Sequence, residues 1–128
     1  MPTILLVDDE PTIRYLLRAS LEGRGYRLIE ADDGPSALQS AQSELPDLIL
    51  LDIALPGLNG LEVCHRLKDD PATATTPVFL LTGYVDQAKR DEAERAGAEG
   101  FIAKPFSPAA LVARIEEALS YRSSIAFH

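Results

Sequence analysis

Residues 48–52 read Leu-Ile-Leu-Leu-Asp, a continuous apolar run that ends in a carboxylate. Residues 4–8 (Ile-Leu-Leu-Val-Asp) and 78–82 (Val-Phe-Leu-Leu-Thr) have the same pattern of four apolar residues followed by a polar one. An unbroken apolar run, in contrast to an alternating one, is typical of a strand that is covered on both faces of a parallel sheet. The three segments therefore predict the central strands of an α/β domain.

Two further runs, at residues 27–31 and 100–103, contain fewer apolar residues and are predicted to be strands nearer the edges of the sheet. A segment with helical periodicity follows each of the five runs. In the first of these segments the predicted buried stripe consists of Ile13, Leu16, Leu17 and Leu21. Five alternations of strand and helix predict a parallel sheet with right-handed crossover connections.

The composition is that of one ordinary globular domain. The chain has 128 residues, of which 46% are hydrophobic and 25% charged, so a packed core is expected. We predict the domain over residues 1–120 and, because the remaining residues lack a clear period, a C-terminal tail over 121–128. The net charge of −8 argues against direct binding to nucleic acid or to anionic membranes, since both need basic surface.

The cellular compartment follows from two weaker signals. The single cysteine excludes a disulfide within the chain and favours a reducing environment. The apolar run at residues 4–7 is too short for a signal peptide or a membrane span. A cytoplasmic location without membrane partners is therefore predicted.

Polar side chains follow four of the five predicted strands. Asp8 and Asp9 follow the first, Asp52 the third, Thr82 the fourth and Lys104 the fifth. Because the carboxyl ends of parallel strands lie at one edge of the sheet, where open α/β sheets bind their ligands, these groups are predicted to converge. Clustered carboxylates either raise a pKa or bind a cation, and oxygen ligands without His or Cys favour Mg²⁺, with Mn²⁺ as an alternative.

The same cluster contains a positive charge, on Lys104, and a hydroxyl donor, on Thr82. Phosphoryl transfer depends mainly on positioning and on the stabilisation of charge, and an aspartate can itself be the nucleophile. The combination of carboxylates, ammonium and hydroxyl therefore favours a site for phosphoryl transfer.

Each of these residues, taken alone, has a simpler interpretation. A single Asp after a strand is usually a turn former or a helix cap, so Asp8 or Asp9 can cap the helix that begins near Pro11. Thr82 can belong to a turn, and Lys104 to a solvated loop. Only their convergence at one edge of the sheet favours the functional interpretation.

Four segments resemble a known family in sequence, order and separation. They are residues 4–10 (ILLVDDE), 52–60 (DIALPGLNG), 81–83 (LTG) and 101–106 (FIAKPF). With them the chain resembles the receiver domain of two-component response regulators, the CheY-like family, from Ile4 to about Leu119. The resemblance implies a doubly wound α/β fold, with five helices around a five-stranded parallel sheet in the order 2-1-3-4-5.

The resemblance also implies roles for individual residues. Asp52 is expected to accept the phosphoryl group. The expected Mg²⁺ ligands are the carboxylates of Asp8, Asp9 and Asp52 and the backbone carbonyl of Ala54. Thr82 is expected to donate a hydrogen bond to the new phosphoryl group and to move towards it.

Lys104 is expected to pair with a phosphoryl oxygen, Pro105 to follow a cis peptide bond, and Phe101 to be the switch aromatic residue. Three positions depart from the common family pattern. Ala54 stands where many relatives have a polar side chain, Leu55 where methionine is common, and Phe101 where tyrosine is frequent. The metal ligand at Ala54 is unaffected because it is a carbonyl, but Phe101 lacks the hydroxyl with which a tyrosine bonds to a partner.

The implied function is two-component signal transduction rather than enzymatic turnover. A histidine kinase or a phosphotransfer protein would supply the phosphoryl group, and phosphorylation would switch the binding of a downstream protein at the fourth and fifth helices. The protein is expected to be a monomer or a phosphorylation-dependent dimer. Whether it stands alone or belongs to a longer regulator or hybrid kinase stays open.

Two other classes of protein fit the sequence less well. A phosphatase of the haloacid dehalogenase type, with an aspartate nucleophile, needs a second acid two residues after it, and that position is Ala54. A dinucleotide-binding module needs a glycine-rich turn after the first strand, but Asp8, Asp9 and Glu10 stand there and would repel a pyrophosphate.

Overall fold

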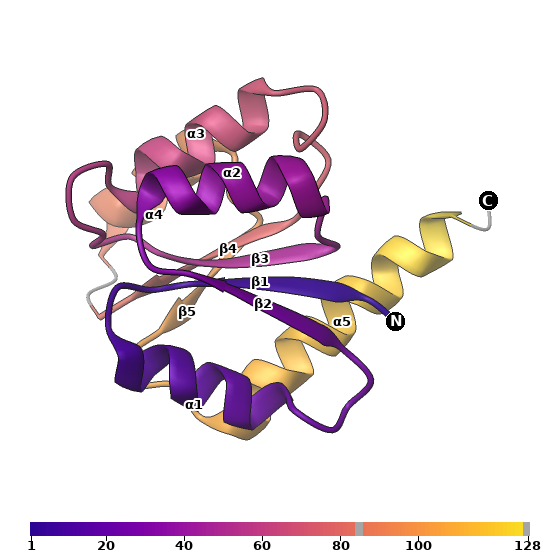
Figure 1. Cartoon of the computed structure of the whole chain (residues 1–128). Helices are drawn as coiled ribbons and strands as arrows, with labels where there is room; N and C mark the ends of the chain where they lie inside the picture. Colours follow the sequence, from indigo (N-terminus) through magenta and orange to yellow (C-terminus); the bar gives the residue numbers. More distant parts are fainter. Residues whose placement is uncertain (84–85, 127–128) are drawn as a thin grey trace.

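A parallel sheet runs through the middle of the molecule, with helices on both faces (Figure 1). The structure is a computed structural model that describes residues 1–83 and 86–126. The elements of this part are β1 (Thr3–Val7), α1 (Pro11–Leu21), β2 (Arg27–Ala31), α2 (Gly34–Glu44), β3 (Leu48–Asp52), α3 (Gly60–Asp69), β4 (Val78–Thr82), α4 (Gln87–Ala96), β5 (Gly100–Ala103) and α5 (Pro108–Ala126). The strand order is β2-β1-β3-β4-β5, which confirms the predicted fold.

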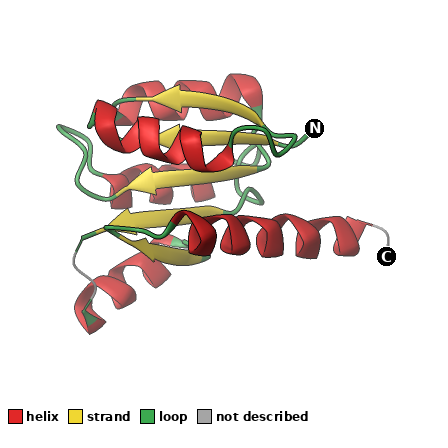
Figure 2. Ribbon diagram, turned by 90° about the horizontal axis from the view of Figure 1, so that it is seen from below, coloured by secondary structure: helices red, strands yellow, loops and turns green. Residues whose placement is uncertain are grey.

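The helices form two layers, one on each face of the sheet (Figures 1 and 2). Helices α2, α3 and α4 cover one face, and α1 and α5 cover the other. Along β3, Ile49 and Leu51 belong to the first core, whereas Leu48 and Leu50 belong to the second. Successive side chains of a strand point to opposite faces, so a strand covered on both sides must be apolar throughout.

The predicted distinction between central and edge strands is confirmed. Strands β3 and β4 are buried along their whole length, and β1 is buried apart from its first residue. The edge strands β2 and β5 are largely exposed or half-buried, with Ala31 and Ile102 as their buried residues. The composition of each run therefore indicated the position of its strand in the sheet.

Helix α1 differs from the prediction at one residue. Leu17 and Leu21 are fully buried and Ile13 packs against them, but Leu16 is 45% exposed. Residues 13, 17 and 21 repeat every four positions and form a narrow stripe under the sheet. Leu16 lies outside that stripe, on the solvent side of the helix, so its predicted burial was wrong.

The chain remains helical beyond the expected end of the domain at residue 120. Helix α5 continues to Ala126 and extends past the sheet (Figures 1 and 2). The segment after residue 120 contains neither Pro nor Gly, and the lack of an apolar period does not by itself end a helix. The last two residues of the predicted tail, 127 and 128, lie outside the described residues, and the boundary of the domain stays a prediction. No helix in the described part of the chain is long and apolar enough to cross a membrane.

Candidate functional site

The register of the sheet brings the polar strand ends together. Asp52 is paired with Leu81 on β4, and Thr82 is paired with Ala103 on β5. Lys104 continues from β5, and its backbone N–H donates to the Thr82 carbonyl at 2.8 Å. Consecutive strands thus deliver Asp52, Thr82 and Lys104 to one edge of the sheet.

The Lys104 ammonium lies between two buried carboxylates. Its Nζ donates to Asp8 Oδ2 at 2.8 Å and lies 3.2 Å from Asp52 Oδ1. Asp8 is 0% exposed and Asp52 is 3% exposed, so water screens these charges only weakly. Two anions therefore share one cation in a region of low solvent access.

This arrangement raises the pKa of Asp52 and the pKa of Lys104. Burial raises the pKa of the Asp52 carboxyl, the charge of Asp8 raises it further, and Lys104 and the Ala54 amide only partly oppose the change. Burial alone would lower the pKa of Lys104, but the Asp8 hydrogen bond and the charges of Asp52 and Asp8 outweigh it, so the pKa of Lys104 is raised. The site as a whole favours an additional positive charge.

Asp8 is held in place by all of its polar groups. Its backbone N–H donates to the Ala31 carbonyl at 3.2 Å, and its carbonyl accepts from Arg14 Nη1 at 2.7 Å. Its side chain accepts from Lys104 and, at 3.0 Å, from the backbone N–H of Glu10. Glu10, not Asp8 or Asp9, is the N-terminal cap residue of α1, and no side chain caps that helix.

Asp9 differs from the buried Asp8 because it is exposed to solvent. Among the residues that the structure describes, no hydrogen bond or ion pair to the Asp9 carboxylate is formed. Carboxylate oxygens of Asp8, Asp9 and Glu10 lie within 4.8 Å of one another. Asp9, unlike Asp8, can therefore turn its carboxylate to a bound ion without losing a partner in the described part of the chain.

The donor set fits Mg²⁺. Asp8, Asp9 and Asp52 offer hard carboxylate oxygens and no nitrogen or sulfur ligand, and Mg²⁺ in proteins is bound by one or two carboxylates together with water and phosphate oxygens. Asp8 and Asp52 place two carboxylates against the single Lys104 ammonium, so the site has an excess of negative charge. A divalent cation would remove that excess.

Gly60 allows α3 to approach the backbone of Asp52 closely. A Cβ atom at Gly60 would lie 2.1 Å from the Asp52 carbonyl oxygen and 2.7 Å from Ile53 Cα. The Gly60 N–H donates to the Ile53 carbonyl at 2.8 Å, and Asn59 caps the helix by accepting from Glu62 N–H. Helix α3 is thus packed directly behind Asp52, where no larger residue fits.

The remaining predicted site residues lie around this centre. The Ala54 N–H donates to Asp52 Oδ1 at 3.2 Å, and the peptide bond between Lys104 and Pro105 is cis. Thr82 is buried at the end of β4. Phe101 stands apart from the carboxylates, because its ring lies beside α4 with the Arg90 guanidinium 5.8 Å from the ring centroid.

Two residues near the centre were not singled out from the sequence. Glu10 joins the acidic cluster, and its place directly after Asp9 was the available signal. Arg14 binds the Asp8 carbonyl, but in the sequence it is only one charged residue on the polar side of α1. Its contact requires the path of the loop before α1, which periodicity does not give.

Comparison with known proteins identifies the family. Over residues 4–116 the sequence matches the response regulator receiver domain. The chain belongs to this family. The receiver domain is 42% identical over 117 residues to the phosphate regulon transcriptional regulatory protein PhoB of Pseudomonas aeruginosa, and the match covers 91% of this chain and 51% of PhoB.

It is also 35% identical over 120 residues to Protein PilH of the same organism, covering 94% of this chain and 99% of PilH. The chain spans about half the length of PhoB and of the Bacillus subtilis regulator ResD. Among solved structures, the receiver domain of a Pseudomonas aeruginosa sensor histidine kinase is 31% identical, with a TM-score of 0.86 and coverage of 93% of this chain and 98% of that chain. That structure has a magnesium ion coordinated in its active-site cleft.

Membership of the family confirms the expected class of function. Receiver domains act in two-component signalling, are phosphorylated on an aspartate with Mg²⁺ and interact with histidine kinases. They are phosphoacceptors rather than enzymes. The chemistry of the carboxylate and lysine cluster in this receiver domain agrees with that class.

Proposed function

We propose that Asp52 is the phosphoacceptor of this receiver domain and that a histidine kinase or a phosphotransfer protein is its donor. The observation that carries the proposal is the position of the Asp52 carboxylate, 3.2 Å from Lys104 Nζ at the carboxyl edge of the sheet. In the transfer, a carboxylate oxygen of Asp52 attacks phosphorus and the phosphorus–nitrogen bond to the donor histidine breaks. The electron pair of that bond stays on the imidazole, which takes up a proton.

The neighbouring residues would stabilise the charge that Asp52 gains. Lys104 would pair with a phosphoryl oxygen on Asp52, because its ammonium already lies beside that carboxylate and has three donors on a flexible stem. The Thr82 hydroxyl, at the end of the adjacent strand, would donate to another phosphoryl oxygen. Bound Mg²⁺, held by Asp8, Asp9, Asp52 and the Ala54 carbonyl, would supply positive charge for the remaining phosphoryl oxygens.

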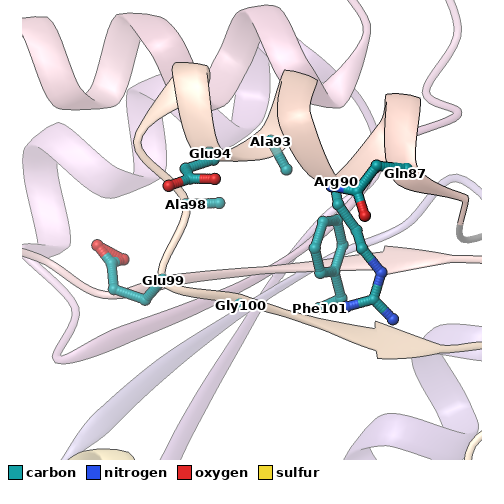
Figure 3. Close-up of a pocket in the computed structure, with 8 residues that line it drawn as sticks. All are labelled: Gln87, Arg90, Ala93, Glu94, Ala98, Glu99, Gly100 and Phe101. Carbon is teal, nitrogen blue, oxygen red and sulfur yellow. The ribbon is translucent and has the colours of Figure 1, made fainter.

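We further propose that a downstream protein docks at α4 and α5, beside Phe101. Between α4 and β5 lies a pocket of about 510 Å³ (Figure 3). Arg90 and Phe101 lie side by side at one end of the pocket, and Glu94 and Glu99 line the other end. A change in the rotamer of Phe101 after phosphorylation would alter the shape and the charge of this pocket. A partner protein could then recognise the phosphorylated state without a tyrosine hydroxyl.

The limits and the assembly of the receiver domain are part of the same proposal. Residues 1–120 would form the domain, which would work in the cytoplasm as a monomer or as a dimer that forms on phosphorylation. Light scattering with and without beryllofluoride distinguishes these two states. A mass that is unchanged by beryllofluoride would exclude the phosphorylation-dependent dimer.

Labelling with acetyl phosphate and Mg²⁺ tests the acceptor. The Asp52→Ala variant is expected to take up no phosphoryl group, whereas Asp69→Ala, which changes an exposed acid of α3, should be labelled like the unmodified protein. Labelling of Asp52→Ala at the normal rate would show that another residue is the acceptor.

A further inference from the structure

The loop between β1 and α1 is tied to β2 by a pair of side chains that is distinct from the carboxylate and lysine cluster. Arg14, in the first turns of α1, donates from Nη1 to the Asp8 carbonyl at 2.7 Å. Its Nε donates to Glu30 Oε1 at 3.1 Å. Glu30 lies on β2, next to the residue whose carbonyl accepts from the Asp8 N–H.

We propose that Arg14 is a positioning residue for Mg²⁺ binding and that Glu30 orients it. The proposal rests on Asp8 and Asp9 as metal ligands, but it concerns the affinity of the site for the ion rather than the chemistry of Asp52. Arg14 does not reach the ion itself. It acts through the backbone of the loop that carries both carboxylates.

The effect on Asp9 follows from the connectivity of this loop. Arg14 fixes the carbonyl of Asp8, and the backbone N–H of Glu10 is fixed by Asp8 Oδ1 at 3.0 Å. The two peptide units that flank Asp9 are therefore both held, although its carboxylate has no partner in the described part of the chain. A ligand that is aimed before the ion arrives loses less conformational freedom on binding, which raises affinity.

The contact of Arg14 differs from an ordinary surface ion pair. Exposed pairs contribute at most about 1 kcal/mol and are held weakly. Arg14 instead uses two sides of its planar guanidinium, one on the Glu30 carboxylate and one on a carbonyl of the buried Asp8. Such a fork fixes orientation as well as distance, and a lysine cannot reproduce it.

A neighbouring residue provides a matched control. Arg18, one turn later on α1, donates from Nε to Glu30 Oε2 at 2.7 Å and from Nη2 to the Leu28 carbonyl at 3.2 Å. It shares Glu30 with Arg14 but makes no contact with Asp8 among the described residues. Removing Arg18 therefore weakens the same ion-pair group without releasing the loop.

The side chains of Arg14 and Glu30 border a pocket that is open to water. The pocket has a volume of about 280 Å³ and is lined by Arg14, Glu30, Ala31, Asp32 and Ser36. Arg14 lines this pocket and donates to the Asp8 carbonyl, so water can take the place of a removed guanidinium and satisfy that hydrogen bond. We therefore expect the Arg14→Gln variant to fold and to differ mainly in the order of its loop.

The experiment measures metal affinity directly, with Mn²⁺ counted by electron paramagnetic resonance and Mg²⁺ measured by competition. Arg14→Gln should bind both ions about tenfold more weakly, at the lower end of the 10–100-fold that supporting partners of metal ligands typically contribute. Arg14→Lys should be intermediate, and Arg18→Gln should stay within about twofold of the unmodified protein. Unchanged affinity in Arg14→Gln, or an equal loss in Arg18→Gln, would overturn the proposal.

A second readout separates positioning from general damage to the site. The Mg²⁺ concentration for half-maximal labelling by acetyl phosphate should rise about tenfold in Arg14→Gln, in parallel with the affinity, while the rate at saturating Mg²⁺ stays close to normal. A lower rate at saturating Mg²⁺ with unchanged half-saturation would contradict a positioning role. If Asp52 were not the acceptor, the Mn²⁺ measurement would still decide the role of Arg14.

Discussion

Two partly buried lysines lie at opposite ends of the sheet and have different surroundings. At the carboxyl end, Lys104 is 17% exposed and contacts Asp8 and Asp52. At the amino end, Lys68 is 16% exposed and forms an ion pair with Glu99. The Lys68 ammonium also donates to the Thr76 carbonyl at 2.7 Å and to the Ala74 carbonyl at 3.2 Å.

The two lysines are buried to a similar extent, but the clusters differ in charge balance and in the burial of their acids, because Glu99 is 37% exposed whereas Asp8 and Asp52 are buried. Lys68 and Glu99 are one cation and one anion, and Glu99 additionally accepts from the Val78 N–H at 2.7 Å, so the group is neutral and its hydrogen bonds are satisfied. Lys104 faces two carboxylates, with further acids beside them. A balanced cluster needs nothing from solution, whereas an unbalanced one is stabilised by a cation. Lysine and carboxylate side chains thus form a structural ion pair at the amino end and a cluster suited to binding a cation at the carboxyl end.

The largest loss of stability is expected at Gly60, where α3 packs against the backbone of Asp52 at the carboxyl end of the sheet. Gly60→Ala should destabilise the domain by about 3 kcal/mol or more, because the new Cβ would lie 2.1 Å from the Asp52 carbonyl oxygen and must displace backbone. Gly83→Ala is the control, since a Cβ there meets nothing within 4 Å, and should stay within about 0.5 kcal/mol. Urea denaturation measures both. Equal stabilities of the two variants would mean that α3 is not held against Asp52.

Removing each lysine in turn tests whether Mg²⁺ stabilises the carboxyl end of the sheet but not the amino end. Lys68→Met should cost about 2 kcal/mol whether or not Mg²⁺ is present, because it leaves the Thr76 carbonyl without its lysine donor and Glu99 with only the Val78 N–H. Lys104→Met should be destabilised in EDTA, where Asp8 and Asp52 face each other without a cation, and should recover with Mg²⁺ by mass action. Thermal unfolding with and without Mg²⁺ gives the four values. A similar Mg²⁺ response of both variants would remove the distinction between the two ends.

A substitution at Asp52 is expected to increase the stability of the domain, by less than the two preceding substitutions decrease it. Because its pKa is raised in the folded protein, its charged form is disfavoured there, and Asp52→Asn should raise the stability in EDTA at neutral pH by about 1 kcal/mol, or about 3–5 °C in Tm. The gain should be complete above the folded-state pKa of Asp52, should decrease as the pH falls through that pKa, and should be absent below the ordinary aspartate pKa, where the carboxyl is protonated in both states. Loss of stability at neutral pH in Asp52→Asn would contradict the charge imbalance.

The fold was predictable from the sequence because its strands carry a strong signal. The continuous apolar run of β3 can be buried only if both faces are covered, and the weaker runs of β2 and β5 marked the edges. The strand order itself followed from the family resemblance, since spacing does not fix it. Leu16 was misjudged because periodicity does not define how wide a buried stripe is. The continuation of α5 to Ala126 was not predicted because a helix without a stop signal has no end that the sequence marks.

The site was predictable where a residue directly follows a strand. Asp8, Asp52 and Lys104 meet at the carboxyl edge because strand direction alone brings them there. Arg14 was not predictable in the same way, because its contact depends on the loop conformation and on the pairing of β1 with β2. The surplus of carboxylates over ammonium groups was expected from the sequence, but the sharing of Lys104 between the buried Asp8 and Asp52 emerged only with distances and burial.

The residue that carries the phosphoryl group decides between Asp52 and its neighbouring carboxylates. The protein is phosphorylated with acetyl phosphate and Mg²⁺ and reduced with borohydride, which converts an aspartyl phosphate to homoserine, and its peptides are mapped by mass spectrometry. We expect homoserine at position 52, where the Asp52 carboxylate lies 3.2 Å from Lys104 Nζ. Homoserine at Asp8 or Asp9, or none at any aspartate, would contradict the assignment of the carboxyl end as a magnesium-dependent acceptor site centred on Asp52.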